Sequence, residues 1–134
     1  YSRQCRRVPS LVQRRVAERT FLALLSRVRA TEQGDIAETL ATSGLFDPRM
    51  PISSQKSFLG HTLGACGALE SWFSIEMMNR DRYVPTLNLD EVDPRCGELD
   101  YLRGGFRVMH NDYVMNNNFA FGGVNTSLIF RRWS

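Results

Sequence analysis

The stretch ISSQKSFLGHTLGACGALE, which runs from Ile52 to Glu70, decides the fold predicted for this chain. Its beginning predicts a short strand over residues 51–54, after which the chain enters a loop. Its end opens a helix, expected from about residue 61 to 79, with Gly64 and Gly67 in the first turns. Because a glycine inside a helix costs about 1 kcal/mol relative to alanine, the two glycines predict that another backbone packs closely there.

The later turns of that helix carry more apolar surface than water tolerates, so a largely buried helix is expected. The apolar side chains are Leu69, Trp72, Phe73, Ile75, Met77 and Met78. Upstream, a capping pattern at Asp35 and Glu38 predicts a second helix that stops near Gly44. Still further upstream, residues 12–28 have the apolar spacing of an amphipathic helix.

Extended segments follow the predicted buried helix. Strands are expected around residues 83–89, 99–102, 113–119 and 125–131. Gly122 and Gly123 separate the last two strands and supply a turn that is free to adopt positive φ. Helices and strands therefore alternate in the manner of a layered α/β protein.

The composition is that of an ordinary water-soluble protein, and 134 residues predict one domain. Hydrophobic residues make up 43% of the chain, and no apolar run approaches the ~20 residues that span a bilayer. The N-terminus has no apolar core followed by a cleavage site, so a cytoplasmic location is expected. Cys5, Cys66 and Cys96 have unrelated spacings, which favours reduced thiols and gives no metal-binding pattern.

The net charge of +3 is unevenly distributed. Residues 1–29 hold eight arginines against the single acidic residue Glu18, a net charge of +7, whereas the remainder carries −4. The basic character therefore belongs to the first segment and does not indicate that the main body binds nucleic acid. The sequence does not favour residues 1–29 as an arm that binds nucleic acid or a membrane surface, because the arginines come without a recognised binding motif.

Lys56 and His61 lie between the predicted strand and the predicted buried helix, where loops often carry function. A histidine at a helix N-terminus meets the positive end of the helix dipole, which favours a neutral ring that donates a hydrogen bond. Such a donor suits a thioester carbonyl or enolate oxygen that gains negative charge in a transition state. A histidine that only caps or packs is the alternative explanation.

Four strings of the sequence, in order, resemble the β-ketoacyl-acyl-carrier-protein synthases of fatty-acid and polyketide synthesis. They are ISSQKSFLGHTLGACGALE, VPTLNLDEVDP, ELDY and YVMNNNFAFGGVNTSLIFRR. The resemblance runs from about residue 30 to the end, and its pair of patterns, KSxxGHxxGAxGxxE and NxFxFGGxN, is specific. It implies the C-terminal half of a thiolase-like layered α/β/α fold, with a mixed sheet and a buried central helix.

The resemblance also implies an acyltransferase, which condenses malonyl carrier protein with an acyl thioester by decarboxylative Claisen condensation. His61 would hydrogen-bond the malonyl thioester carbonyl and stabilise the carbanion left by decarboxylation. Lys56 would organise the site with Glu70 as its carboxylate partner, and an ordinary ion pair is the alternative for these two. Substrates would be carried on the phosphopantetheine of acyl carrier protein, without a metal or other cofactor. The intact family form would be a homodimer.

Further roles fall on residues near the two ends of the matched region. Phe121 would gate the acyl pocket, and its backbone N–H would form one side of the oxyanion hole. Gly122 and Gly123 would let that loop approach the substrate, and Thr31 would hydrogen-bond the pantetheine arm. Core packing is the alternative for Phe121.

Two catalytic groups of the family are missing from the matching positions. The family's nucleophilic cysteine lies far upstream of the matched region, and this chain does not reach that far. Cys66 lies inside the predicted helix, where the family has a small residue and where burial would leave a thiol inert. Arg27 stands at the place of a catalytic histidine, and arginine cannot shuttle a proton near neutral pH. The chain alone is therefore expected to be inactive.

The resemblance begins near residue 30, and this point divides the chain in two. Residues 1–29 form an unrelated arginine-rich segment, for which a shifted reading frame, a misplaced start, disorder and a helix are open interpretations. Residues 30–134 form the C-terminal synthase domain. A non-catalytic remnant, or a structural partner of a separately encoded N-terminal half, is the alternative function. Half of a layered fold should expose apolar faces meant for the other half, such as those of Trp72 and Phe73.

Overall fold

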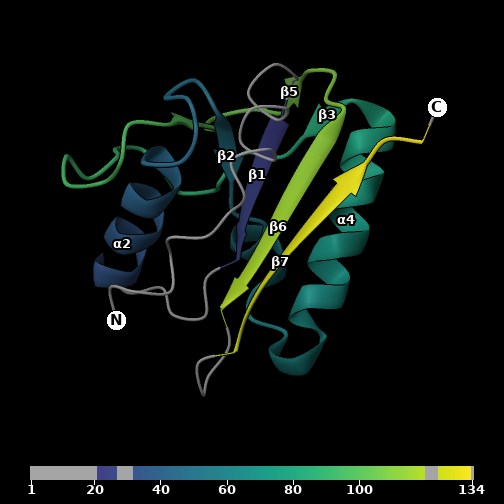
Figure 1. Ribbon diagram of the computed structural model, residues 1–134, viewed down its shortest axis with the longest axis horizontal. Coiled ribbons are helices and arrows are strands. Elements are labelled where there is room, and N and C mark those ends of the chain that lie inside the picture. The colour runs from purple at the N-terminus through teal and green to yellow at the C-terminus, as the bar shows by residue number, and fades with distance from the viewer. Residues whose placement is uncertain (1–20, 27–31, 120–123, 134) are drawn as a thin grey trace.

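A computed structural model describes residues 21–26, 32–119 and 124–133, and the side chains of residues 33–119 and 124–133 (Figure 1). The elements are, in chain order, β1 (Phe21–Ser26), α2 (Glu32–Ser43), β2 (Pro51–Ser53), α3 (Lys56–Leu59), the 3-10 helix η1 (Leu63–Ala65), α4 (Cys66–Arg80), β3 (Arg82–Tyr83), β4 (Asp100–Tyr101), β5 (Arg107–Val108), β6 (Tyr113–Phe119) and β7 (Asn125–Arg131). The strands predicted at 113–119 and 125–131 are confirmed.

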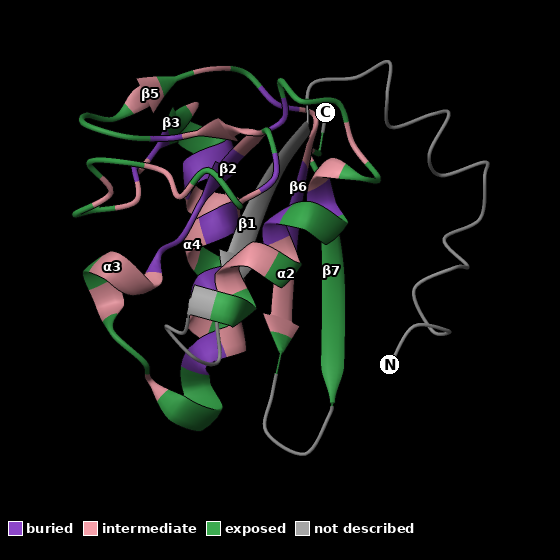
Figure 2. Ribbon diagram, turned by 90° about the vertical axis from the view of Figure 1, so that its left-hand side faces the viewer, coloured by how far each residue is buried: buried purple, intermediate pink, exposed green. Residues whose placement is uncertain are grey.

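The main sheet has the strand order β4-β2-β1-β6-β7. The β4-β2, β2-β1 and β1-β6 pairs are parallel, whereas β6 and β7 run antiparallel, so the sheet is mixed as expected. The helices α2 and α4 cover opposite faces of this sheet (Figures 1 and 2). A layered α/β arrangement is therefore confirmed.

Residues 21–26 correct the helix that the sequence predicted over 12–28. They form β1, which pairs along its length with β6 and also pairs with β2. The run FLALLS is almost wholly apolar, as is typical of parallel strands with neighbours on both sides. A short apolar run does not by itself distinguish a strand from a helix, which is why the spacing of the apolar residues predicted a helix here. Residues 12–20 and 27–28 of that prediction lie outside the described residues.

The start of α2 and the segment after β2 also differ from the prediction. Asp35 does not cap α2, because the helix begins at Glu32 and Asp35 already lies within it. The predicted stop is confirmed, since α2 ends at Ser43 and the Gly44 N–H donates to the Leu40 carbonyl at 3.0 Å. The segment after β2 is not a plain loop but the short helix α3.

The core lies on both faces of the sheet, as the colouring by burial in Figure 2 shows. Adjacent residues of a strand point to opposite faces, and Val114 and Met115 of β6 belong to two different clusters. Val114 packs with the end of α4, in a cluster that includes Met77, Met78, Tyr83 and Leu102. Met115 packs with Met50 and Ile52 at the α2 side.

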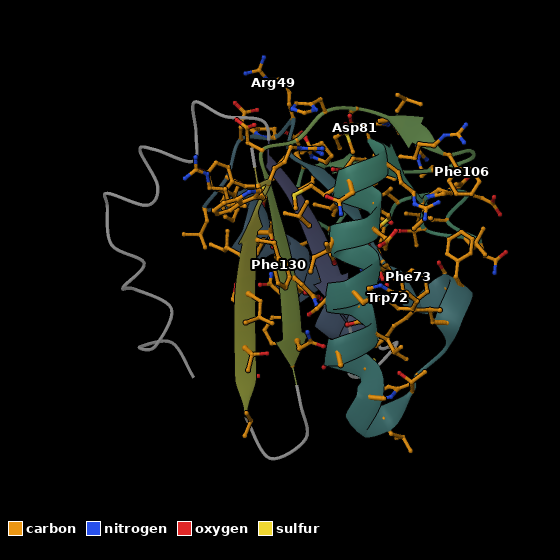
Figure 3. The ribbon with its side chains drawn as sticks, turned by 90° about the vertical axis from the view of Figure 1, so that its right-hand side faces the viewer. Arg49, Trp72, Phe73, Asp81, Phe106 and Phe130 are labelled. Atoms are coloured by element: carbon orange, nitrogen blue, oxygen red, sulfur yellow. The ribbon has the colours of Figure 1, made fainter. Side chains whose placement is uncertain are left out.

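The helix α4, which the sequence predicted to be largely buried, is buried along one side only. The buried side consists of Cys66, Glu70, Ser74, Met77 and Met78. Trp72 is 57% exposed and Phe73 is partly exposed, and Figure 3 shows both on the side of α4 that faces away from the sheet. The exposure expected for this apolar face is confirmed. Among the helices that the structure describes, none is long and apolar enough to cross a bilayer.

Candidate functional site

The candidate site is built around an enclosed ion pair between α3 and α4. The Lys56 ammonium at the start of α3 donates to Glu70 Oε1 on α4, and only 14% and 4% of the two side chains are exposed. Lys56 Nζ also lies 2.7 Å from Cys66 Sγ. Cys66 Sγ in turn lies 3.4 Å from Glu70 Oε1. The three side chains therefore form one contiguous cluster.

The local sequence explains how this cluster is assembled. Cys66 and Glu70 are four residues apart on α4, so they lie on the same face of the helix. Strand β2 delivers the chain to Gln55, whose buried side-chain Nε2 reaches the Glu70 carbonyl and Ser74 Oγ, both at 3.4 Å. Lys56 follows directly. Gln55 and Lys56 thus fasten the start of α3 to the buried side of α4.

His61 lies between α3 and η1 and is exposed. The Leu63 N–H donates to His61 Nδ1 at 3.1 Å. When Nδ1 of a neutral imidazole accepts a hydrogen bond, Nε2 carries the ring proton. The neutral ring therefore presents an Nε2–H donor. The helix predicted from residue 61 begins later than expected, because residues 63–65 form the tighter η1 turn before α4.

The end of β6 lies against the first turn of α4. A Cβ atom added to Gly67 would meet the Asn118 side chain at 3.5 Å, an ordinary contact distance, whereas one added to Gly64 would meet nothing within 4 Å. The Asn116 amide of the same strand donates to Ser71 Oγ at 3.1 Å. The nearest atoms at Gly67 belong to a side chain, so the close packing of another backbone that the two glycines predicted is not found at either of them among the described residues.

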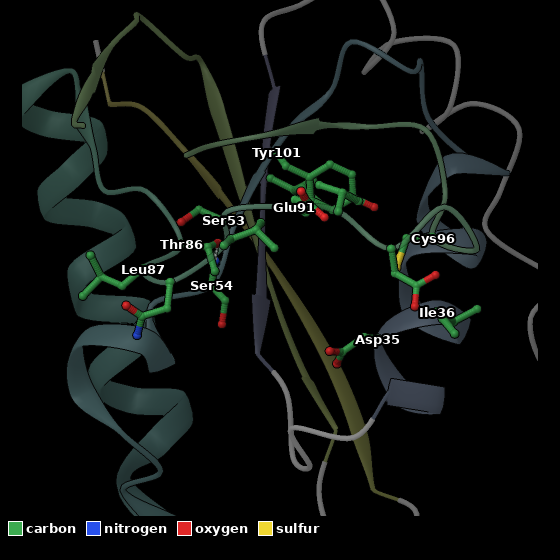
Figure 4. Close-up of a pocket in the computed structure, with 14 residues that line it drawn as sticks. Asp35, Ile36, Ser53, Ser54, Thr86, Leu87, Glu91, Cys96 and Tyr101 are labelled. Carbon is green, nitrogen blue, oxygen red and sulfur yellow. Dashed lines mark hydrogen bonds between the residues drawn. The ribbon is translucent and has the colours of Figure 1, made fainter. Parts of the chain in front are cut away.

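A separate cavity of about 310 Å³ lies on the α2 side of the sheet (Figure 4). Asp35 and Ile36 from α2, Ser53 and Ser54 from β2, and Tyr101 from β4 are among its lining residues. His61, Lys56 and Glu70 do not line it. This cavity is therefore distinct from the cluster that the sequence predicted.

The structure brings together only some of the residues that the sequence singled out. Lys56 and Glu70 are in contact, and His61 lies in the segment that joins their two helices. The remaining candidates, which are Thr31, Phe121, Gly122 and Gly123, lie outside the described residues, as does Arg27.

The sequence reasoning missed Cys66 as a partner of the ion pair. Its burial was expected and is found, since Cys66 is 8% exposed. Its sulfur, however, lies beside the charged groups of Lys56 and Glu70. The spacing of Cys66 and Glu70 could have indicated one shared face. Nothing in the sequence places Lys56 beside the thiol, because that contact depends on how α3 turns back onto α4.

Comparison with known proteins gives the same family from sequence and from structure. The family model for the beta-ketoacyl synthase C-terminal domain matches residues 23–90, so the match starts inside β1, upstream of residue 30. The chain is 36% identical over 107 residues to 3-oxoacyl-[acyl-carrier-protein] synthase 2 of Synechocystis sp.. That alignment covers 78% of this chain and 26% of the relative.

Two solved structures are similar to the fold described above. A beta-ketoacyl synthase from Burkholderia phymatum is 59% identical, with a TM-score of 0.80 over 86% of this chain and 28% of the other. A type II PKS acyl-carrier protein in complex with its ketosynthase bound to the hexaketide matches at 25% identity. Its TM-score is 0.76 over 88% of this chain and 29% of that one.

The chain thus spans about a quarter of the length of the curated relatives that it matches. The mixed sheet, the two covering helices and the matched residues all agree with one assignment. This chain belongs to the beta-ketoacyl synthase family, of which it contains the C-terminal domain.

Proposed function

We propose that this chain supplies the C-terminal part of a β-ketoacyl-acyl-carrier-protein synthase. The whole enzyme would condense a malonyl thioester with an acyl thioester, both carried by acyl carrier protein, and would release carbon dioxide. Relatives in the curated set are named 3-oxoacyl-[acyl-carrier-protein] synthases, and one similar solved structure holds a ketosynthase with its acyl-carrier protein. Fatty-acid and polyketide pathways are both represented among these similar proteins.

The observation that carries this proposal is the orientation of the His61 ring. Because Leu63 N–H occupies Nδ1, the neutral imidazole has its donor at Nε2, on an exposed ring before the first turn of a helix. Loss of carbon dioxide from a malonyl thioester moves negative charge onto the thioester oxygen. A fixed neutral donor stabilises that charge without adding a cation to the site.

Lys56 and Glu70 act in this proposal as positioning residues. Their ion pair joins the start of α3 to α4, and His61 lies in the short segment between the two helices. Fixing both ends of that segment reduces the number of positions available to the imidazole. A donor held in place contributes more to catalysis than one that must be ordered during the reaction.

The other assigned residues stay proposals from the sequence. Phe121 would gate the acyl pocket beside Gly122 and Gly123, and Thr31 would bind the pantetheine arm. The Asn118 side chain lies beside the α4 turn at Gly67, and Phe121 follows Asn118 by three residues in the sequence, which supports the proposal that the Phe121 segment lies near the start of α4.

Condensation also needs the family's nucleophilic cysteine and a histidine at the place of Arg27. We propose that a segment bearing that cysteine packs on the exposed Trp72 side of α4. The same proposal includes acyl carrier protein as partner and a homodimeric intact form. It also includes a cytoplasmic location and a reaction that needs no metal or other cofactor.

The test is a chimera in which residues 30–134 replace the matching region of the Synechocystis relative. The relative then supplies the cysteine and the missing histidine. We expect the chimera to condense malonyl and acyl carrier protein, and a His61→Ala version to lose about 10²- to 10³-fold in kcat, as for removal of an oxyanion donor. A His110→Ala version, which removes the other histidine of the chain, is the control and should keep its activity. A folded chimera whose kcat is unaffected by His61→Ala would refute the assignment.

A structural partner of a separately encoded N-terminal half is the second candidate, and the exposed Trp72 face favours it. Mixing the full chain with a cysteine-bearing half of a relative tests this candidate. Association measured by sedimentation supports the partner function, and the absence of association supports a non-catalytic remnant.

A further inference from the structure

We propose that Cys66 and Lys56 form an oxidation-sensitive pair, in which a hydroperoxide converts the thiol and the amine into a covalent sulfenamide crosslink. The two atoms that would be joined, Cys66 Sγ and Lys56 Nζ, are already 2.7 Å apart. The family resemblance gives position 66 no role, and the crosslink does not depend on the catalytic function proposed above. It is a modification site built into the contact between α3 and α4.

The thiol belongs to a cluster of three side chains that contact one another. Glu70 Oε1 accepts from both Lys56 Nζ and Cys66 Sγ, the latter at 3.4 Å. The Glu70 side chain is only 4% exposed, and its second oxygen, Oε2, is buried without a hydrogen-bond partner among the described residues. A buried carboxylate with spare acceptor capacity thus lies directly beside the sulfur and the amine, where it can receive a proton.

The reaction balances with one equivalent of hydroperoxide. In the case of hydrogen peroxide, the sulfur of Cys66 attacks one peroxide oxygen, the O–O bond breaks, and the thiol proton leaves in a water molecule, which gives a sulfenic acid. The Lys56 ammonium then passes one proton to the Glu70 carboxylate. The resulting amine attacks the sulfur, an S–N bond forms, the S–O bond breaks, and the hydroxyl leaves as a second water.

The products explain why Glu70 matters to this step. Formation of the crosslink removes the positive charge of Lys56, and the proton that it loses neutralises Glu70. No uncompensated charge is therefore left in the buried cluster, whereas a lone buried carboxylate would be costly. A sulfenic acid is known to condense with a backbone nitrogen to give a sulfenamide, and in this proposal the Lys56 amine takes the place of that nitrogen.

The chain is well suited to a decisive test, because Lys56 is its only lysine. Trypsin cleaves the reduced chain after Arg49, Lys56 and Arg80, which yields peptides 50–56 and 57–80. A crosslinked Lys56 is no longer a trypsin site. Treatment of the folded full chain with hydrogen peroxide, followed by digestion and mass spectrometry, should replace both peptides by a single peptide 50–80 that lacks two hydrogens. Dithiothreitol should restore cleavage.

Three controls define what the crosslink requires. Cys66→Ala should keep cleavage after Lys56 under the same peroxide treatment. Lys56→Arg should accumulate a sulfenic acid at Cys66 that dimedone traps, without a crosslink. The wild-type chain oxidised in urea should also give no crosslink, because unfolding separates the two side chains.

Two results would overturn the proposal. The first is a folded, peroxide-treated chain in which Cys66 is unmodified or carries only a dimedone-trapped sulfenic acid while trypsin still cleaves after Lys56. The second is a crosslink that forms equally well in urea, since proximity in the fold would then have no part in it.

Discussion

At the scale of single residues, the ion pair of Lys56 and Glu70 is the most enclosed one that the structure describes. Removing two charges from water is costly, and the cost is offset only while both charges are present. The exposed pair of Glu76 and Arg80 on the same helix contributes little to stability, because water and salt screen the attraction between its charges. The two pairs therefore differ in what a single substitution should do.

Glu70→Gln is expected to lower the free energy of unfolding by about 3–5 kcal/mol, because it removes the negative charge that faces the Lys56 ammonium in the enclosed ion pair. The double variant Lys56→Met with Glu70→Leu should be less destabilised than Glu70→Gln. Glu76→Gln is the matched control and should change stability by less than about 0.5 kcal/mol. Urea denaturation followed by circular dichroism measures all three. Equal effects of Glu70→Gln and Glu76→Gln would contradict this explanation.

Gly97 offers a second test at this scale, which concerns packing. A Cβ atom at Gly97 would lie 2.3 Å from both the Thr39 carbonyl oxygen and Ser43 Oγ of α2. Because backbone cannot move aside easily, Gly97→Ala should destabilise the fold by about 1–3 kcal/mol. Gly105→Ala meets nothing within 4 Å and should be close to neutral. Thermal denaturation compares the two, and a neutral Gly97→Ala would show that α2 and the loop are less tightly packed.

At the scale of secondary structure elements, the sequence predicted those elements whose local pattern and tertiary role agree. Strands β6 and β7 have the expected bounds, and α2 ends before Gly44 as predicted. The strand β1 was missed because its apolar run fits a helix equally well. Its identity depends on pairing with strands far along the chain, which no local pattern records.

The candidate site was predictable to a similar extent. The motif around Lys56 and His61 indicated a functional loop, and the pairing of Lys56 with Glu70 followed from the family resemblance. The place of Cys66 in that cluster was not predictable, because it depends on the fold of α3 back onto α4. The Nδ1 contact of His61 was equally hidden, since it depends on the η1 turn.

The C-terminus of α4 carries a charge network that makes a prediction about pH. The pKa of Asp81 is lowered from its usual 3.8, first because His110 hydrogen-bonds its carboxylate and further because Arg132 lies beside it. Since the folded pKa lies below the unfolded one, the carboxylate stabilises the fold above the unfolded value. That stabilisation is lost as the pH falls through the folded pKa.

Asp81→Asn should therefore be less stable than the wild type at pH 6, and the difference should shrink below about pH 4. Asparagine suits this position, because Asp81 has a left-handed backbone with a φ of 51° that asparagine tolerates. Asp90→Asn is the control for a general loss of negative charge. Urea midpoints between pH 6 and pH 2 give the comparison, and a difference that stays constant down to pH 2 would exclude the mechanism.

At the scale of the whole molecule, the fold leaves apolar surface uncovered on two sides. Strand β7 is an edge strand, with Leu128 and Ile129 each about half exposed. On the other side, Trp72 and Phe106 border an apolar groove of about 380 Å³ between α4 and the β3 region. Contiguous patches of this kind favour association, whereas single exposed apolar residues do not.

The isolated chain should therefore self-associate, and Trp72→Glu should increase the monomeric fraction without altering the circular dichroism spectrum. Trp133→Glu is the matched control, because Trp133 is 95% exposed and is not part of the groove. Sedimentation velocity measures the distribution of species. A monodisperse wild-type monomer with a sharp cooperative thermal transition would contradict the prediction.

The proposed function depends on His61 donating its Nε2–H to a thioester carbonyl. A crystal structure of the chimera with a bound, non-hydrolysable malonyl thioester analogue would show whether it does. We expect His61 Nε2 within about 2.7–3.2 Å of the thioester oxygen, with Leu63 N–H still donating to Nδ1. If other groups hold the carbonyl of the bound analogue and the His61 ring is turned away from it, His61 does not have the role proposed for it.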